Sequence, residues 1–221
     1  MVNLTRIYTR TGDNGTTSLG DMSRTGKNDP RLKAYADVDE ANCAIGVVLA
    51  QAGLDDDVRV LLTTIQNDLF DVGADLCTPV VEEPEHPPLR ITDAYIEAIE
   101  KACDEYNERL EPLRSFVLPG GTPAAAHLHV ARTVVRRAER STWGALDMYH
   151  GGMNPLTATY LNRLSDLLFI LARVANAGND VLWQPRPLLT PPRFPRNPAE
   201  AFRMTVVPGK AMRFGRIPGE T

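Results

Sequence analysis

The chain of 221 residues has a net charge of −4 and is 43% apolar, enough for a buried core in one large or two small domains. The acidic balance disfavours nucleic acid and anionic membranes as partners, and no apolar run is long enough for a transmembrane helix. Three cysteines without a CxxC pair, and a beginning MVNLTRIYTRTGD without a signal core or presequence pattern, predict a cytoplasmic protein with reduced thiols.

The first predicted element, residues 1–31, is a loop that contains YTRTGDNGTTSLG. This stretch combines three glycines, five threonine and serine hydroxyls and Arg10, groups that suit an anion. Gly15 and Gly20 have the glycine spacing of a phosphate loop, but Asp and Met follow where Lys and Ser or Thr would stand. The loop therefore predicts an anion site whose main cation lies elsewhere in the chain.

Helical periodicity marks five segments, and the rest of the chain shows almost no alternating strand pattern. The segments are residues 32–51, 56–76, 92–110, 122–148 and 154–175. Acidic residues open the second segment, a threonine cap opens the third, and Thr-Pro and Asn-Pro pairs open the last two. The predicted fold class is all-α, a five-helix antiparallel bundle that is ferritin-like in general shape.

Three stretches do not fit a helix: the opening loop, residues 78–91 with four prolines, and residues 185–221 with eight. The last stretch has seven Lys or Arg and two Glu, so it carries +5 while the remainder is acidic. A basic, Pro-rich composition is typical of an irregular extension. We therefore expect one domain over residues 1–184 and an irregular C-terminal extension over residues 185–221.

Two single residues before the fourth helix stand out. Asp39 lies within AYADVDEANCAIG, where small neighbours permit close helix contact. It is either a surface charge or a buried partner of an arginine such as Arg132, since a buried carboxylate needs a cation. Phe116 lies within SFVLPGG, ahead of two glycines. It either fills the core or presents its ring to a flat ligand.

The fourth helix contains HVARTVVRRAER, which is rich in arginine. At about 100° per residue, Arg132, Arg136 and Glu139 fall within one arc of about 60°. Arg140 lies beside this arc, and Arg137 points further round the helix. Two arginines four residues apart can bind a polyphosphate, but an Arg–Glu face can equally be a solvated surface.

The fifth helix, YLNRLSDLLFILARVAN, has an apolar core stripe and a polar cluster on the opposite side. The cluster consists of Asn162, Ser165, Asp166 and Phe169, and it is either a soluble surface or part of a site. The sequence contains no HExxH, CxxC or GxSxG motif and no evident Cys–His pair. What remains is a set of anion-binding groups without a protein nucleophile or base.

A resemblance to the PduO-type ATP:cob(I)alamin adenosyltransferases is carried, in chain order over about residues 5–184, by TRTGDNGTTSLG, Lys27, AYADVDEANCAIG, SFVLPGG, HVARTVVRRAER and YLNRLSDLLFILAR. It implies a homotrimer of five-helix bundles with active sites between subunits. It also implies transfer of the 5′-deoxyadenosyl group of ATP to the Co(I) centre of cobalamin, with tripolyphosphate as the leaving group. Mg²⁺ would be held mainly by the ATP phosphates, without a dedicated protein site. The alternative is a non-catalytic carrier or regulatory protein that binds ATP and cobalamin.

The same resemblance implies roles for residues of this chain. ATP-binding roles fall on Thr9, Arg10, Thr11, Gly12, Thr17, Ser18, Lys27, Arg136, Arg137, Glu139, Arg140 and Asn162. Catalytic roles fall on Arg136 at the triphosphate, on Phe116, which would exclude the lower axial ligand, and on Asp39 with Arg132, an ion pair between subunits. Cobalamin-binding roles fall on Phe116, Phe169 and Asp166.

The chain departs from the family pattern in two places. Arg10 stands where many members have lysine, which changes the geometry of a phosphate contact. The extension after Gln184 is long for the family, and we assign no functional residue to it. The implied partners, besides ATP and cob(II)alamin or cob(I)alamin, are a reductase and an adenosylcobalamin-dependent mutase.

Overall fold

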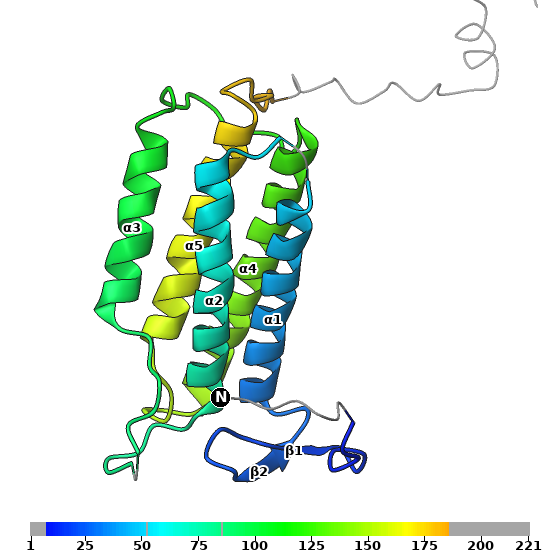
Figure 1. Cartoon of the computed structure of the whole chain (residues 1–221), viewed down its shortest axis with the longest axis vertical. Coiled ribbons are helices and arrows are strands. Elements are labelled where there is room, and N and C mark those ends of the chain that lie inside the picture. The colour runs from blue at the N-terminus through cyan, green and yellow to red at the C-terminus, as the bar shows by residue number, and fades with distance from the viewer. Residues whose placement is uncertain (1–7, 52, 85, 186–221) are drawn as a thin grey trace, which may run out of the picture. The chain divides into compact units, whose positions relative to one another are not determined.

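The computed structural model describes residues 8–51, 53–84 and 86–185, which form five helices and one two-stranded sheet. The helices are α1 (Pro30–Leu49), α2 (Asp56–Cys77), α3 (Asp93–Asn107), α4 (Pro123–Met148) and α5 (Leu156–Ala175). Figure 1 shows that each helix runs opposite to the one before it. The predicted all-α, five-helix antiparallel bundle is therefore confirmed.

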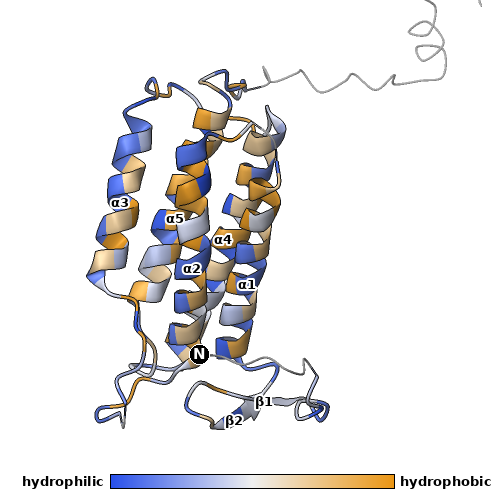
Figure 2. Cartoon of the chain, viewed as in Figure 1, coloured by the Kyte–Doolittle hydropathy of each residue, from blue (hydrophilic) through white to orange (hydrophobic). Residues whose placement is uncertain are grey.

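The core lies among α1, α2, α4 and α5, and α3 packs against α5. Figure 2 shows apolar and hydrophilic residues sharing the circumference of the helices, the pattern of an amphipathic helix. The largest fully buried apolar side chains come from α1, α2, α4 and α5, and they include Ile45, Leu62, Ile65, Leu69, Leu128, Leu161, Leu164 and Leu167.

The three helix starts predicted from cap residues differ in their hydrogen bonds. Thr122 is the N-cap of α4, and its Oγ1 accepts a hydrogen bond from the backbone N of Ala125 at 3.2 Å. Thr92 is the N-cap of α3 as predicted, but its side chain makes no cap hydrogen bond. The N-cap of α5 is Pro155, one residue after the predicted Asn154, whose Oδ1 accepts a hydrogen bond from the backbone N of Leu156 at 3.1 Å.

The opening loop, which we expected to be irregular, contains a short antiparallel hairpin. In it β1 (Thr16–Ser18) pairs with β2 (Arg24–Gly26). Strands of three residues without alternating apolar side chains carry no strand signal, so the sequence did not predict them. Figure 1 shows the hairpin beside the end of the bundle where α1 begins and α2 ends.

Hydrogen bonds anchor this hairpin to the bundle. The backbone N of Gly20 donates to the carbonyl of Cys77 at 2.9 Å, at the end of α2. Thr25 and Tyr149 both donate a hydroxyl hydrogen bond to Asp29 Oδ2, at 2.7 and 2.5 Å. The hairpin is thus tied to the starts and ends of three helices.

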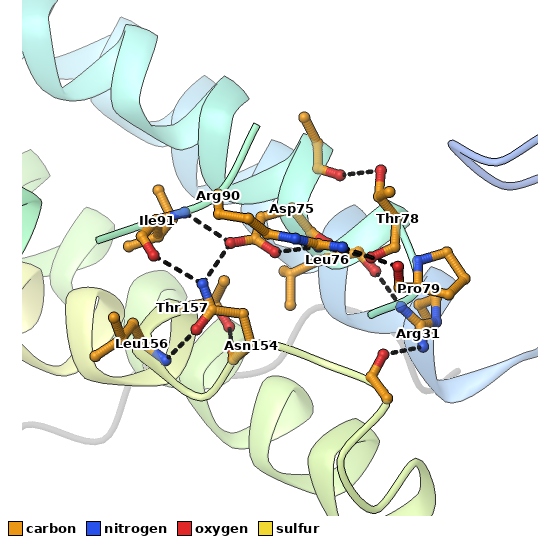
Figure 3. Close-up of polar contacts among 12 residues, drawn as sticks. Arg31, Asp75, Leu76, Thr78, Pro79, Arg90, Ile91, Asn154, Leu156 and Thr157 are labelled. Atoms are coloured by element: carbon orange, nitrogen blue, oxygen red, sulfur yellow. Dashed lines mark hydrogen bonds and ion pairs between the residues drawn. The ribbon is translucent and has the colours of Figure 1, made fainter. Parts of the chain in front are cut away.

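A buried polar network holds the proline-rich loop 78–91 against the same end of the bundle (Figure 3). Asp75 is fully buried, and its carboxylate accepts hydrogen bonds from Arg90, at 2.6 Å, and from the backbone N of Ile91 and Asn154 Nδ2, both at 2.7 Å. Arg90 also donates to the carbonyl of Thr78 at 2.7 Å. Proline has no backbone N–H, so this loop has fewer backbone hydrogen-bond donors. The side chains of Arg90 and Asn154 supply donors in their place.

The chain divides into two compact units after Trp183, close to the predicted boundary after residue 184. Nearly all of the predicted extension lies outside the described residues, so the domain division stays a prediction. Within residues 8–51, 53–84 and 86–185, no helix combines the length and the apolar composition needed to cross a bilayer.

Candidate active site

The hairpin region brings together the seven residues of the opening segment that we predicted to bind ATP. They are Thr9, Arg10, Thr11, Gly12, Thr17, Ser18 and Lys27. Lys27 lies over Gly12 so closely that a Cβ at Gly12 would be 3.1 Å from its Nζ. The hydroxyls of Thr9 and Thr11 are 2.9 Å apart. Lys27 and Gly12 thus lie side by side, as do Thr9 and Thr11, whereas Thr17 and Ser18 follow one another in β1 and point to opposite faces of the hairpin.

An arginine that the sequence analysis did not select braces this loop. Arg24 donates hydrogen bonds to the carbonyl of Thr11 at 2.8 Å, to Ser18 Oγ at 3.3 Å and to Thr16 Oγ1. Its position in β2, opposite the loop, depends on the hairpin that the sequence did not predict. Arg10 adopts a left-handed backbone conformation with φ 63°, which is uncommon for a residue with a Cβ.

The arginine-rich motif of α4 serves two different faces. Arg137 forms ion pairs with Asp37, at 3.8 Å, and with Glu40, both on α1. Glu139 instead accepts a hydrogen bond from Asn162 Nδ2 of α5 at 3.2 Å. The predicted ATP contact of Arg137 stays a prediction, and its contacts within the chain favour a structural role. The structure brings Glu139 and Asn162 together, as the predicted ATP site requires.

Two of the other arginines of the motif are unpaired. Arg136 and Arg140 are exposed and make no hydrogen bond or ion pair within the part of the chain that the structure describes. Arg140 lines a groove of about 510 Å³ between α1 and α4, together with Lys33, Arg137 and the carboxylate of Asp37. Asp37 pairs with Arg137, so Arg140 keeps a positive charge there that is available for an anion.

A cavity of about 790 Å³ lies at the end of the bundle where α4 begins and α5 ends. Most of its wall is apolar or aromatic, and the lining includes Leu113, Phe116, Val117, His129, Arg132, Phe169 and Trp183. A cavity of this size is within the range of small-molecule and cofactor sites. Phe169 lines this cavity, whereas Asp166 is exposed and does not, and the cobalamin-binding roles of both stay predictions.

Phe116 stands at the mouth of the cavity. Its side chain is 78% exposed, so the interpretation that it fills the core is wrong. Its ring meets that of Trp183 edge to face, with 6.1 Å between ring centres, and its carbonyl accepts a hydrogen bond from the backbone N of Trp183 at 2.7 Å. The pairing presents two aromatic rings that a flat ligand can contact.

Arg132 and Asp39 are not paired with one another within the chain. Burial, and then the charge of Arg136, lowers the pKa of Arg132, and its Nε lacks a hydrogen-bond partner among the described residues. Asp39 is exposed on α1. The predicted ion pair between subunits stays a prediction, and both groups are available for it.

The two halves of the predicted site lie at opposite ends of the bundle. Figure 1 places the hairpin beside the start of α1, whereas the cavity borders the start of α4 at the far end. From Arg132 to the end of α4 at Met148, the helix rises about 24 Å at 1.5 Å per residue. One chain therefore cannot bring its own hairpin to its own cavity without a large rearrangement.

Sequence reasoning missed His129, Trp183 and Arg24. His129 precedes Arg132 by three residues and Arg136 by seven on the same face of α4, a spacing that could have identified it. Trp183 carries no such signal, because it reaches the cavity only through a bridge in which Val117 lies opposite Leu182.

We predict that Gly121→Ala destabilises the wall of the cavity. Gly121 has φ 106°, and a Cβ there would lie 2.1 Å from Oδ1 of the buried Asn176. Asn176 accepts a hydrogen bond from the backbone N of Thr122 and donates one to the carbonyl of Gly120, so a clash would release this segment. We expect a loss of about 2 kcal/mol, read as a melting midpoint lower by roughly 4–8 °C.

The matched control for this prediction is Gly73→Ala. Gly73 lies inside α2, and a Cβ there would meet nothing within 4 Å. The stability of the helix should rise slightly, since alanine favours a helix more than glycine does. Equal melting midpoints for the Gly121 variant and the unmodified protein would contradict the clash.

Known proteins share this architecture. A family model described as cobalamin adenosyltransferase matches residues 7–175. The chain is 65% identical over 184 residues to the corrinoid adenosyltransferase of Mycobacterium tuberculosis, which covers 83% of this chain and 95% of that protein. It is 43% identical over 171 residues to the corrinoid adenosyltransferase PduO of Salmonella typhimurium. That match covers 77% of this chain and 50% of the Salmonella protein. A variant PduO-type ATP:corrinoid adenosyltransferase from Lactobacillus reuteri, solved with cobalamin and ATP, is 35% identical with a TM-score of 0.74, covering 81% of this chain and 100% of that one.

Proposed function

The chain belongs to the cobalamin adenosyltransferase family, and we propose that it transfers the 5′-deoxyadenosyl group of ATP to the Co(I) centre of cobalamin. The observation that carries this is the family match, which runs from the opening loop to the end of α5 and takes in the hairpin, the α4 arginines and most of the cavity wall. In this reaction Co(I) supplies the electron pair that forms the Co–C bond, and the C5′–O bond to the triphosphate breaks. The substrate is itself the nucleophile, which agrees with a site rich in anion-binding groups.

The described residues support a division of labour between the two regions. Lys27 and Arg136 would stabilise the charge that develops on the departing tripolyphosphate. The apolar cavity around Phe116 and Phe169 would take the corrin ring. We propose that the hairpin of one subunit faces α4 of another in a homotrimer, because the two regions of one chain lie at opposite ends of its bundle. Light scattering that gave the mass of a single chain would contradict this.

We propose that Mg²⁺ reaches the site with ATP. The ATP phosphates would supply most of its ligands. We also propose a cytoplasmic location, where a reductase supplies the electron for Co(I) and a mutase uses the product.

Turnover tests the function directly. The protein is mixed with MgATP and chemically reduced cobalamin, and the cob(I)alamin absorbance is followed. Loss of this band with formation of adenosylcobalamin and tripolyphosphate is the expected result. Tight ATP binding without turnover would favour a carrier protein instead.

We predict that Phe116→Ala impairs the reaction from Co(II) more than the reaction from pre-reduced Co(I). A ring that occludes the lower axial position makes Co(II) easier to reduce, and alanine is too small to do so. We expect the ratio of the two rates to fall by about tenfold, equivalent to about 1.4 kcal/mol.

The control for this prediction is Phe70→Ala, which removes an equally exposed ring from α2, outside the cavity. It should leave the ratio of rates unchanged. Equal losses from both cobalt states in the Phe116 variant would count against a role in excluding the lower ligand.

A further inference from the structure

His129 is a buried polar side chain without a partner. It is 3% exposed, and neither ring nitrogen makes a hydrogen bond within the described part of the chain. Burying a polar group unpaired costs free energy, so such groups call for an explanation. His127 shows the ordinary case two residues earlier on α4, because its Nδ1 lies 2.8 Å from the carbonyl oxygen of Pro123.

The position of His129 points to a ligand. The imidazole lines the 790 Å³ cavity and meets Phe169 edge to face, with 6.0 Å between ring centres. The lining also holds Arg114, Ser115, Arg132 and Trp183, which offer donors, but His129 is the lining residue whose two buried ring nitrogens both lack a partner among the described residues. On the same face of α4 it precedes Arg136 by seven residues, about 10 Å along the axis. His129 therefore lies at the cavity end of α4, away from the predicted triphosphate position at Arg136.

The surroundings of the imidazole favour its neutral form. Burial, and then the positive charge of Arg132, lowers the pKa of His129. A neutral imidazole offers one N–H donor and one nitrogen acceptor. A primary carboxamide offers both donors and an acceptor, and it matches this pair without burying a charge.

We propose that His129 hydrogen-bonds a peripheral carboxamide of the corrinoid and so orients the ring in the cavity. The inference rests on the proposed function, since it takes the cavity as the corrinoid pocket. His129 is a substrate-binding residue in this account, and its unpaired nitrogens are reserved for the ligand. The free protein is correspondingly less stable than it would be with an apolar side chain at this position.

The test compares His129→Leu and His129→Gln with the unmodified protein. Calorimetric titration with cobinamide, a corrinoid that carries peripheral amides and lacks the lower nucleotide ligand, measures the affinity without the effect of Phe116 on that ligand. His129→Leu should bind cobinamide about tenfold more weakly, the effect of one lost hydrogen bond, with ATP affinity unchanged. The melting midpoint of its ligand-free form should stay equal or rise, because an unpaired polar group is removed. His129→Gln, which keeps a donor and an acceptor, should recover much of the affinity.

His127→Leu is the control, since it removes a histidine from the same helix and should leave cobinamide affinity within about twofold, less than the effect of one hydrogen bond. A lower melting midpoint of His129→Leu with unchanged cobinamide affinity would overturn the inference and indicate a structural role. If the unmodified protein turned over but both His129 variants bound cobinamide as tightly as the unmodified protein does, only this inference would fail. If the unmodified protein bound no corrinoid and gave no turnover, the proposed function itself would fail.

Discussion

Arg136→Ala should lower kcat/KM for adenosyl transfer by about 10²–10³ while leaving the fold intact. Arg136 is exposed and makes no hydrogen bond or ion pair within the described residues, and its nearest charge effect is repulsion of Arg132, so its removal should take away no stabilising interaction of the chain. Its charge is available for the triphosphate, on which negative charge develops as the C5′–O bond breaks. The effect should therefore appear in turnover, measured from the cob(I)alamin absorbance, and not in the melting midpoint.

Two variants sharpen this result. Arg136→Lys keeps the charge but loses the planar, two-pronged hydrogen-bonding group, and it should recover only part of the rate. Arg109→Ala removes an exposed arginine of the α3–α4 connection that pairs with Asp57 of α2, and it should leave turnover unchanged. Normal turnover by Arg136→Ala would refute the triphosphate assignment. Arg137→Ala in the same assay decides whether that arginine also binds ATP or only forms its ion pairs with α1. A loss of turnover would indicate ATP binding.

Asp75→Asn should destabilise the protein by about 3–5 kcal/mol, the typical cost of breaking a buried ion pair. Each partner of the Asp75 side chain is a donor: the Arg90 guanidinium, the backbone N of Ile91 and the amide of Asn154. An asparagine would turn an NH₂ group toward some of these donors and leave the Arg90 charge without a counterion. Thermal or urea unfolding at constant protein concentration should show the midpoint falling by roughly ten degrees or more.

The control is Asp57→Asn, the same change on the same helix. Asp57 pairs with Arg109 at 2.9 Å, but both side chains are largely exposed to solvent. Such pairs contribute little, so the midpoint should barely change. If Asp75→Asn and Asp57→Asn shifted the midpoint equally, the network shown in Figure 3 would not be a main support of the fold.

The helices were predictable because their signals are local. Periodic apolar residues, Thr122 with Pro123, and the Asn154 cap act within one or two turns, so the sequence alone is enough to read them. The hairpin was not predictable, since its three-residue strands pair through backbone atoms and carry no side-chain pattern. Thr92 occupies the predicted N-cap of α3, but whether its side chain makes the cap hydrogen bond depends on local geometry that the residue type does not specify.

The sequence by itself determined the fold class, the composition of the opening loop and the arginine stripe of α4. Residue type and helical spacing are enough for these, because they depend on neighbours in the chain. Only the tertiary structure decided that Phe116 stands at a cavity mouth, that Arg137 forms ion pairs with α1, and that Asp75 holds a loop fifteen residues away. These depend on contacts between segments distant in sequence, where burial and geometry choose among partners that the residue types alone leave open.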